Sequence, residues 1–287
     1  MVSFSIPTVD LSPFFNEGVD QDGKKKAMEI IAKACSDYAF FQVVNHGVPL
    51  SLMTRALELS KTFFELPIEE KLQSSPCSGG PRPLPAGYNR PEHSAEKNEY
   101  LVIIPPGSSF NVYSTNPPDF REIQFIAHFT KTGLLVESIL NECLGLPPNF
   151  LKEYNDDRSG DAMAALCYSP ATDTENNGIS DHEDANCFTF VFQDETGGLE
   201  VLKDGDWIPV TPTEDAIVVN INDVIQVLSN NKFKSATHKV VKPTGRNRHS
   251  YAFFYTLAGY KWVEPLPQFT KEIGEPPKYR GFVYKEY

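Results

Sequence analysis

Two histidines and one aspartate in the second half of the chain have the types and spacing to hold a metal ion. His182 and Asp184 are two residues apart, so in an extended segment their side chains point the same way, with Cα atoms roughly 7 Å apart. His238 offers a second imidazole from a later segment. Two histidines and one carboxylate on one face form the triad that holds non-haem Fe(II) and leaves positions open for substrates and O₂. The alternative is a capping Asp184 beside a surface His182, with His238 bonded to the backbone in the core.

A second pair, Arg248 and Ser250, follows His238 after a turn at Pro243-Thr244-Gly245. The turn predicts that Arg248–Leu257 pairs with the strand that carries His238. An arginine inside a barrel is destabilising unless it meets an anion, and its planar fork suits a carboxylate held by two hydrogen bonds. A serine hydroxyl two residues on could donate a third hydrogen bond. The alternative is a surface arginine at the end of a hairpin.

Short strands are expected to position these side chains. From residue 161 onward, segments rich in β-branched and aromatic residues alternate with turn residues, which is typical of an all-β sandwich or barrel. Asp204-Gly205 favours a tight hairpin, because it supplies the positive φ angles of a type I′ turn. Glu175–Ser180, rich in glycine and asparagine, is expected to be a loop. The expected strands are Ala162–Tyr168, Phe188–Phe192, Leu199–Leu202, Trp207–Val210, Ala216–Ile221, Ala236–Val241 and Ser250–Leu257.

The first half of the chain favours helices around one short strand. Phe40–Val44 is an apolar run that stops at Asn45-His46-Gly47. Apolar residues recur at helical spacing in three segments. Helices packed outside a C-terminal β-barrel are therefore the expected architecture, which is mainly β with flanking helices. The expected helices are residues 24–37, a helix capped by Ser51, and residues 118–143, in which Ile123, Ala127, Thr130, Leu134/Leu135 and Ile139 face inward.

The composition describes a folded, acidic protein. Of the 287 residues, 40% are apolar and 22% are charged, which allows a sizeable core and excludes global disorder. The formal net charge of −12 argues against a general nucleic-acid or anionic-membrane surface. No apolar run reaches the ~18 residues of a membrane helix, and residues 1–7 lack the features of a secretory signal. Five cysteines without a CxxC pair favour free thiols in the reducing cytosol, so we expect a cytoplasmic protein.

No linker is long and polar enough to separate two independent domains. We expect residues 1–115 to form an N-terminal region of helices and strands, and residues 116–287 to form the long helix and the core with the candidate triad, together one compact unit. Residues 76–91 are crowded with proline and glycine, and a loop of this length is either an active-site lid or a connector. Tyr88, within this loop, is a candidate substrate contact.

Together these residues resemble the plant-type 2-oxoglutarate- and Fe(II)-dependent dioxygenases, which have an isopenicillin N synthase-like fold. The H-x-D…H…R-x-S pattern of that family falls on His182, Asp184, His238, Arg248 and Ser250. The resemblance covers nearly the whole chain. It extends to Ile6–Leu11, Phe40–Val48, Phe192-Gln193-Asp194, Gly198–Val201, Leu228-Ser229-Asn230 and Lys234–Val240.

This resemblance implies a double-stranded β-helix, or jelly-roll, core packed by the N-terminal and long central helices. His182, Asp184 and His238 would be the Fe(II) ligands, and Arg248 and Ser250 would bind the distal carboxylate of 2-oxoglutarate. The implied reaction uses 2-oxoglutarate and O₂ and yields succinate and CO₂, with ascorbate as reductant. The charges are consistent, because Fe²⁺, one aspartate and dianionic 2-oxoglutarate leave a single negative charge that Arg248 neutralises.

The resemblance also gives a role to Tyr168, which matches a family tyrosine that contacts the cosubstrate, whereas Leu166 replaces the asparagine of the same N-Y-Y-P motif. By the two-residue period of a strand, Leu166 and Ala164 share the face of Tyr168, and Phe254 shares that of Arg248. These side chains predict an apolar, aromatic pocket beside the metal, which suits a small ring-bearing molecule. The alternative is that they are ordinary core residues.

We therefore expect an oxygenase that hydroxylates, desaturates, demethylates or cyclises a small, largely apolar plant metabolite or hormone. It would act as a monomer on a small-molecule substrate, without nucleic-acid or membrane partners. The main alternative is a same-fold oxidase that does not use 2-oxoglutarate, of the aminocyclopropane-carboxylate oxidase or isopenicillin N synthase type, since these relatives also keep an R-x-S. Residues 278–282 do not resemble the ethylene-forming type. A ligand-binding protein without activity is a third alternative, disfavoured by the intact set of three metal ligands.

Overall fold

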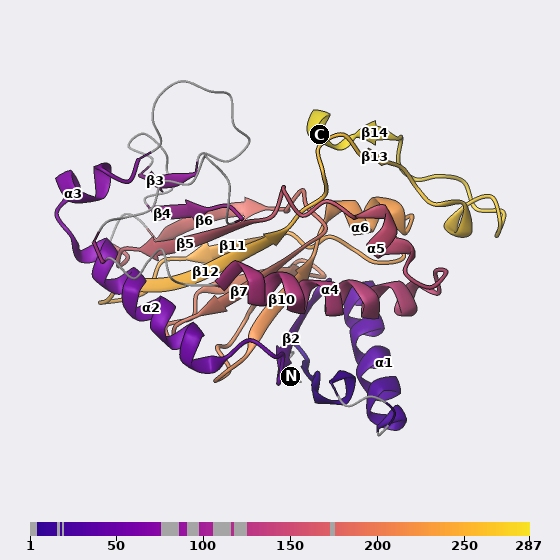
Figure 1. The fold of residues 1–287 in the computed structure, drawn as a ribbon, viewed down its shortest axis with the longest axis horizontal. Helices are drawn as coiled ribbons and strands as arrows, with labels where there is room; N and C mark the ends of the chain where they lie inside the picture. Colours follow the sequence, from indigo (N-terminus) through magenta and orange to yellow (C-terminus); the bar gives the residue numbers. More distant parts are fainter. Residues whose placement is uncertain are drawn as a thin grey trace.

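Two β-sheets face each other at the centre of the molecule (Figure 1). The computed structural model describes residues 5–15, 18, 20–75, 86–90, 98–105, 116–117, 125–172 and 176–287. An eight-stranded sheet has the order β1-β2-β10-β7-β12-β5-β4-β3, a four-stranded sheet has the order β6-β11-β8-β9, and β13 pairs with β14. The strands are β1 (Thr8–Asp10), β2 (Phe40–Val44), β3 (Gly87–Asn89), β4 (Asn98–Ile103), β5 (Ala162–Tyr168), β6 (Asn177–His182), β7 (Phe188–Gln193), β8 (Leu199–Lys203), β9 (Asp206–Pro209), β10 (Ile217–Ile221), β11 (His238–Val241), β12 (Arg248–Tyr255), β13 (Trp262–Val263) and β14 (Phe282–Val283).

Most strands after residue 161 lie where the sequence predicts them. β5 has the predicted bounds, and β7, β8, β9, β10, β11 and β12 differ from the prediction by one or two residues at their ends. The β8–β9 hairpin turns at Asp204 and Gly205, whose φ angles of 53° and 91° are both positive, as a type I′ turn requires. The alternation of apolar and turn residues was therefore a sufficient signal for these strands.

Two expectations about strands beside the candidate triad are wrong. The segment expected to be a loop up to Ser180 instead forms β6, from Asn177 to His182. Its polar residues hide the strand pattern, and Gly178 is needed because a Cβ there would lie 2.9 Å from the carbonyl oxygen of Val240. In addition, β12 does not pair with β11. It lies between β5 and β7 in the larger sheet, whereas β11 lies between β6 and β8 in the smaller one, so the turn at 243–247 crosses between the sheets.

α1 and α2 confirm the expected helical periodicity, but α1 begins three residues before the expected Lys24 and the expected cap of α2 is wrong. α1 starts at Gln21, because the Asp20 side chain accepts a hydrogen bond from the Gly23 amide at 2.7 Å. Ser51 does not cap α2, which begins at Leu50 with Pro49 at the capping position. Within the described residues, no helix is long and apolar enough to cross a membrane. The helices are α1 (Gln21–Asp37), α2 (Leu50–Glu65), α3 (Ile68–Leu72), α4 (Phe125–Leu144), α5 (Phe150–Tyr154) and α6 (Asp223–Leu228), with short 3-10 turns at Ser12–Phe14, Pro267–Phe269 and Tyr284–Glu286.

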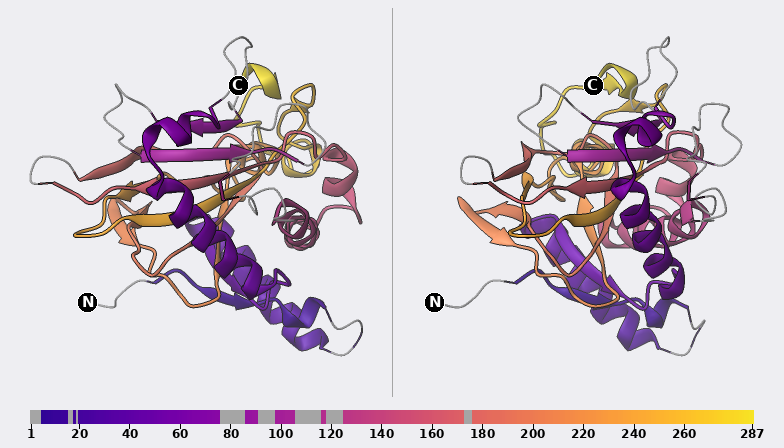
Figure 2. Two further views of the ribbon diagram at one scale, coloured as in Figure 1. Left: turned by 60° about the vertical axis from the view of Figure 1, so that its left-hand side comes forward. Right: turned by 90° about the vertical axis from the view of Figure 1, so that its left-hand side faces the viewer.

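α2 and α4 contact strands of the larger sheet, and Figure 2 shows α2 running along that face. Residues 118–124 of the expected long helix lie outside the described residues, and its end before Gly145 is confirmed. The expected inward face is only partly right. Ile139 is buried and Leu135 is half-buried, but Ala127 and Leu134 are exposed and Thr130 is only half-buried. Aromatic stacking sets the orientation instead, because Phe129 packs on Phe192 of β7 with ring centroids 5.7 Å apart.

A buried polar cluster lies at the far end of β12. Asp161 is fully buried, accepts a hydrogen bond from the Thr256 amide at 2.9 Å and lies 3.7 Å from the Arg158 guanidinium. Burial raises the pKa of Asp161 to about 7, against 3.8 for a free side chain, although the Arg158 charge opposes this shift. The folded chain therefore keeps a proton that the unfolded chain has already released above pH 4. The unfolding free energy is expected to fall as the pH rises through this window.

Replacing Asp161 with asparagine is expected to stabilise the protein at alkaline pH. Asp161→Asn keeps an acceptor for Thr256 and removes the ionisation, so the unfolding free energy should exceed that of the wild type by about 2 kcal/mol at pH 8 and show no gain at pH 4. Urea unfolding at both pH values measures this difference, with the exposed Asp206→Asn as control. An unfolding free energy of Asp161→Asn equal to that of the wild type at both pH values would contradict the raised pKa of Asp161.

Candidate metal and cosubstrate site

His182, Asp184 and His238 converge between the two sheets. His182 ends β6 and lies opposite His238, the first residue of β11, in the antiparallel register of the smaller sheet. The Asp184 carboxylate lies 3.6 Å from His182 Nε2 and 4.0 Å from His238 Nε2. One ligand atom from each residue lies within 4.8 Å of the other two, and the described part of the chain contains no other such group of three. The donor set and spacing fit a single divalent cation with open coordination positions.

Backbone carbonyls orient both imidazoles. His182 Nδ1 is 2.8 Å from the Ser180 carbonyl oxygen, and His238 Nδ1 is 3.0 Å from that of Ala236. A carbonyl only accepts, so each Nδ1 carries the proton and each Nε2 keeps its lone pair for a ligand. Burial also lowers the pKa of His238, against the opposing effect of Asp184, which favours the neutral imidazole that binds metals.

Two residues that sequence reasoning missed hold the carboxylate. Asp184 Oδ2 accepts hydrogen bonds from Thr189 Oγ1 at 2.7 Å and from Asn220 Nδ2 at 3.0 Å. These bonds occupy Oδ2, so Oδ1 is the oxygen more available to a metal. Asn220 is 1% exposed in the otherwise apolar strand β10, and a buried amide in such a run is the one signal that the sequence offered.

Arg248 is a buried cation whose hydrogen-bond partners are neutral. It is 1% exposed, its Nη1 is 2.9 Å from Ser250 Oγ, and its Nη2 is 2.7 Å from Gln193 Oε1. The guanidinium also lies 4.8 Å from the ring centroid of Tyr168. The nearby Asp194 carboxylate is bonded to backbone amides, and burial lowers the pKa of Arg248. Arg248 Nε and Gln193 Nε2 are buried without a partner, which fits an additional acceptor such as a carboxylate.

One cavity of about 80 Å³ joins the triad to Arg248. It is largely apolar, and most of the candidate residues lie on its wall, since Leu166, Tyr168, Ser250 and Phe254 all line it. Ala164 lies farther along β5, in a small apolar cluster. The remaining described lining residues are Ile179, Thr189, Val191, Leu199, Val240 and Ala252.

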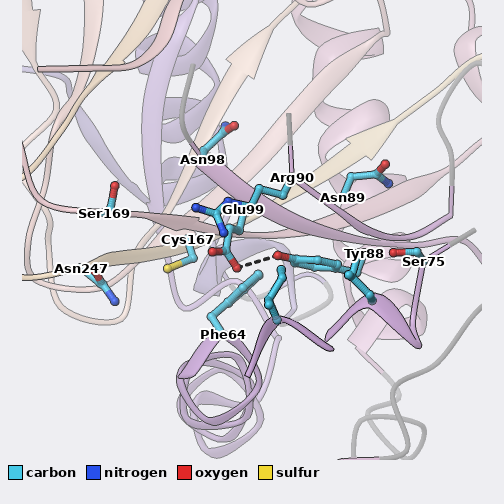
Figure 3. Close-up of a pocket in the computed structure, with 12 residues that line it drawn as sticks. Phe64, Ser75, Tyr88, Asn89, Arg90, Asn98, Glu99, Cys167, Ser169 and Asn247 are labelled. Carbon is cyan, nitrogen blue, oxygen red and sulfur yellow. Dashed lines mark hydrogen bonds between the residues drawn. The ribbon is translucent and has the colours of Figure 1, made fainter. Parts of the chain in front are cut away.

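The structure does not bring Tyr88 to the triad. Tyr88 is 1% exposed and lines a separate pocket of about 690 Å³, where its hydroxyl donates to Glu99 Oε2 at 3.0 Å (Figure 3). Glu99 also pairs with Lys71 at 2.6 Å. Cys167 lines this pocket from the face of β5 opposite Leu166 and Tyr168, so the larger sheet separates it from the triad. Residues 76–85 and 91 of the expected loop lie outside the described residues.

Comparison with known proteins places both halves of the chain in one family. Residues 159–257 match the model of the 2OG-Fe(II) oxygenase superfamily, and residues 6–129 match that of the non-haem dioxygenase in morphine synthesis N-terminal region. A flavonol synthase/flavanone 3-hydroxylase of Matthiola incana is 33% identical over 98% of this chain and 96% of its own length. A 1-aminocyclopropane-1-carboxylate oxidase of Musa acuminata is 31% identical over 99% of this chain and 92% of its own.

Solved structures agree in fold. The crystal structure of JOX2 in complex with 2OG, Fe and JA is 29% identical to this chain, with a TM-score of 0.85 over 99% of this chain and 84% of that one. A structure of dioxygenase for auxin oxidation in rice is 24% identical and has a TM-score of 0.81 over 99% of this chain and 93% of that one, a likeness of fold. The mainly β architecture thus matches that of jelly-roll oxygenases. The chain therefore belongs to the 2-oxoglutarate- and Fe(II)-dependent oxygenase superfamily, and it is a dioxygenase that uses Fe(II) and 2-oxoglutarate.

Proposed function

We propose that His182, Asp184 and His238 bind Fe(II), and that Arg248 and Ser250 bind the distal carboxylate of 2-oxoglutarate. The observation that carries this proposal is one cavity with two ends, a triad whose ligand atoms lie within 4.8 Å of one another and a buried cation without a carboxylate partner. Binding of Fe²⁺ and of dianionic 2-oxoglutarate would leave the cavity electrically neutral. The two positive charges of Fe²⁺ and the one of Arg248 offset the negative charge of Asp184 and the two carboxylates of 2-oxoglutarate. Tyr168, stacked on the guanidinium, would form the wall beside the cosubstrate.

The chain's own residues would position the reactants and exclude water. When bound, Fe(II) and 2-oxoglutarate supply an oxidative decarboxylation that activates O₂ for attack on a C–H bond, releasing succinate and CO₂. Arg248 would fix one end of the cosubstrate, so that its other end reaches the triad. Leu166, Val191 and Phe254 line the cavity and would keep water from the reacting atoms. Ascorbate would serve as reductant.

The substrate would be a small, largely apolar plant metabolite or hormone that is hydroxylated, desaturated, demethylated or cyclised. The apolar wall formed by Leu166 and Phe254 supports this class, and Ala164 lies on the same strand just beyond it. The alternative expected from the sequence, an oxidase that does not use 2-oxoglutarate, is not better supported, although a 1-aminocyclopropane-1-carboxylate oxidase matches nearly the whole chain. Succinate formed in step with substrate loss would separate the two, because only the first reaction makes it.

The proposed organisation is one compact unit, a jelly roll packed by the N-terminal and long central helices. Residues 1–115 would form its first region and residues 116–287 its catalytic core. Strands β1 to β4 of the first region join the larger sheet, which supports a single unit. We further propose a cytoplasmic monomer without nucleic-acid or membrane partners, in keeping with the net charge of −12 and with four described cysteines that are free thiols.

Removal of a metal ligand is expected to abolish turnover. His182→Ala or Asp184→Ala leaves two ligands, so succinate release should fall by about 100-fold or more and Fe(II) binding should weaken in anaerobic equilibrium dialysis. Asp181→Ala is the matched control, because this acidic side chain is exposed on the same strand. Full activity of Asp184→Ala would refute the ligand assignment.

Loss of the buried arginine is expected to raise the requirement for 2-oxoglutarate. Arg248→Lys keeps the charge but loses the planar fork, and Arg248→Ala loses both, so the KM for 2-oxoglutarate should rise by about tenfold and by about 30-fold or more, respectively. Arg246→Ala is the control, since Arg246 is exposed and pairs with Glu195. An unchanged KM in both Arg248 variants would show that the cosubstrate binds elsewhere.

Removal of a hydrogen bond to Asp184 is expected to lower the affinity for Fe(II) without unfolding the chain. Thr189→Val removes the hydroxyl that donates to Asp184 Oδ2, and Fe(II) affinity should fall by about tenfold or more. Thr62→Val, at an exposed position of α2, should leave the affinity as in the wild type. Equilibrium dialysis measures both variants, and wild-type affinity of Thr189→Val would mean that this bond does not position the carboxylate.

A further inference from the structure

A second cavity, of about 570 Å³, adjoins the triad. It shares Asp184 and Phe254 with the smaller cavity, so a molecule inside it touches the candidate metal site. Its wall combines the segment after Asp184, the end of β12 and residues 284–287. Its volume is within the range of cavities that take small-molecule ligands.

Residues 282–287 are fixed against the core as one wall of this cavity. β14 pairs with β13, and the amides of Tyr284 and Lys285 donate to the carbonyl oxygens of Lys261 and Gly259, both at 2.9 Å. Figure 1 shows β14 next to β13 at the C-terminal end of the chain. The Tyr287 hydroxyl donates to Asp223 Oδ2 at 2.7 Å, and Asp223 begins α6. The wall is therefore tied to the body of the protein at several points.

The same wall carries one basic residue, Lys285, which is exposed at the edge of the cavity. Lys285 is the one basic side chain among the described lining residues, and Asp184, a member of the candidate triad, is the one acidic side chain. Among the described residues Lys285 forms no salt bridge, whereas the neighbouring Lys261 pairs with Asp156 at 2.7 Å. Much of the remaining lining is apolar or aromatic, including Leu257, Phe254 and Tyr284. The lining thus has the chemistry to accept an apolar body with one negative group.

We propose that this cavity binds a small apolar or aromatic carboxylic acid as the substrate, and that the Lys285 ammonium pairs with its carboxylate. This inference rests on the proposed function, because it names the substrate class of the same site. The carboxylate at Lys285 would hold one end of the molecule, and Phe254 would direct its apolar body toward Asp184. Lys285 would thus select acids over neutral molecules of the same shape.

The test compares acids with their own methyl esters. The probes are 1-naphthylacetic acid, cinnamic acid and cyclohexylacetic acid, each with its ester, titrated by calorimetry into anaerobic protein loaded with Fe(II) and 2-oxoglutarate. At least one acid should bind the wild type about threefold more tightly than its ester, as expected for an ion pair with an exposed lysine. Lys285→Gln should lose this preference while its ester affinity stays unchanged. Lys271→Gln, at an exposed position outside the cavity, should keep it.

Each outcome decides the proposal. It is overturned if no acid binds more tightly than its ester, or if Lys285→Gln keeps the preference for acids. Failure of the proposed function is visible separately, in the titrations of Fe(II) and 2-oxoglutarate that precede the probes. The acids and esters are then titrated into the chain without Fe(II), because Lys285 and the apolar wall do not depend on the metal, and the same two criteria apply.

Discussion

The pairing register of β6 against β11 is the constraint on which the site depends. It sets His182 opposite His238, and because side chains alternate along a strand, a shift by one residue would turn one imidazole to the other face of the sheet. The backbone therefore places the two histidines before any metal contributes. Gly178 protects this register, since a side chain at that position would collide with the neighbouring strand. Asp184, just past the end of β6, then needs only Thr189 and Asn220 to hold it in place.

The opposite end of the small cavity depends on an unbalanced charge. Arg248 is buried among Ser250, Gln193 and Tyr168, and none of these neutral groups compensates for the loss of its hydration. A ligand with a carboxylate would recover part of that energy, so binding and stability are linked at this residue. Two strands of the larger sheet, β12 and β7, supply the arginine and its glutamine partner, which fixes their separation.

Much of the fold and of the candidate site could be predicted from the sequence, because the signals are local. The spacing of His182 and Asp184, and that of Arg248 and Ser250, follows from the period of a strand. The predictions that were wrong concern features that depend on distant parts of the chain. A turn after His238 does not reveal that the next strand joins the other sheet, and the orientation of α4 depends on aromatic residues of β7. The bond between Thr189 and Asp184, and the position of Tyr88 beyond the larger sheet, are likewise tertiary and leave no local pattern.

The side chains on the two faces of β12 have different surroundings. Tyr251 and Phe253 point away from the small cavity into the core, where Tyr251 stacks on Phe192 and Phe253 packs against Phe129 at a tilt. Ala252 and Phe254 point toward the cavity. Because alternate residues of one strand face the aromatic packing and the cavity, the two sets of side chains do not overlap. Positions 252 and 254 can therefore change the shape of the cavity while the aromatic residues of the opposite face stay the same.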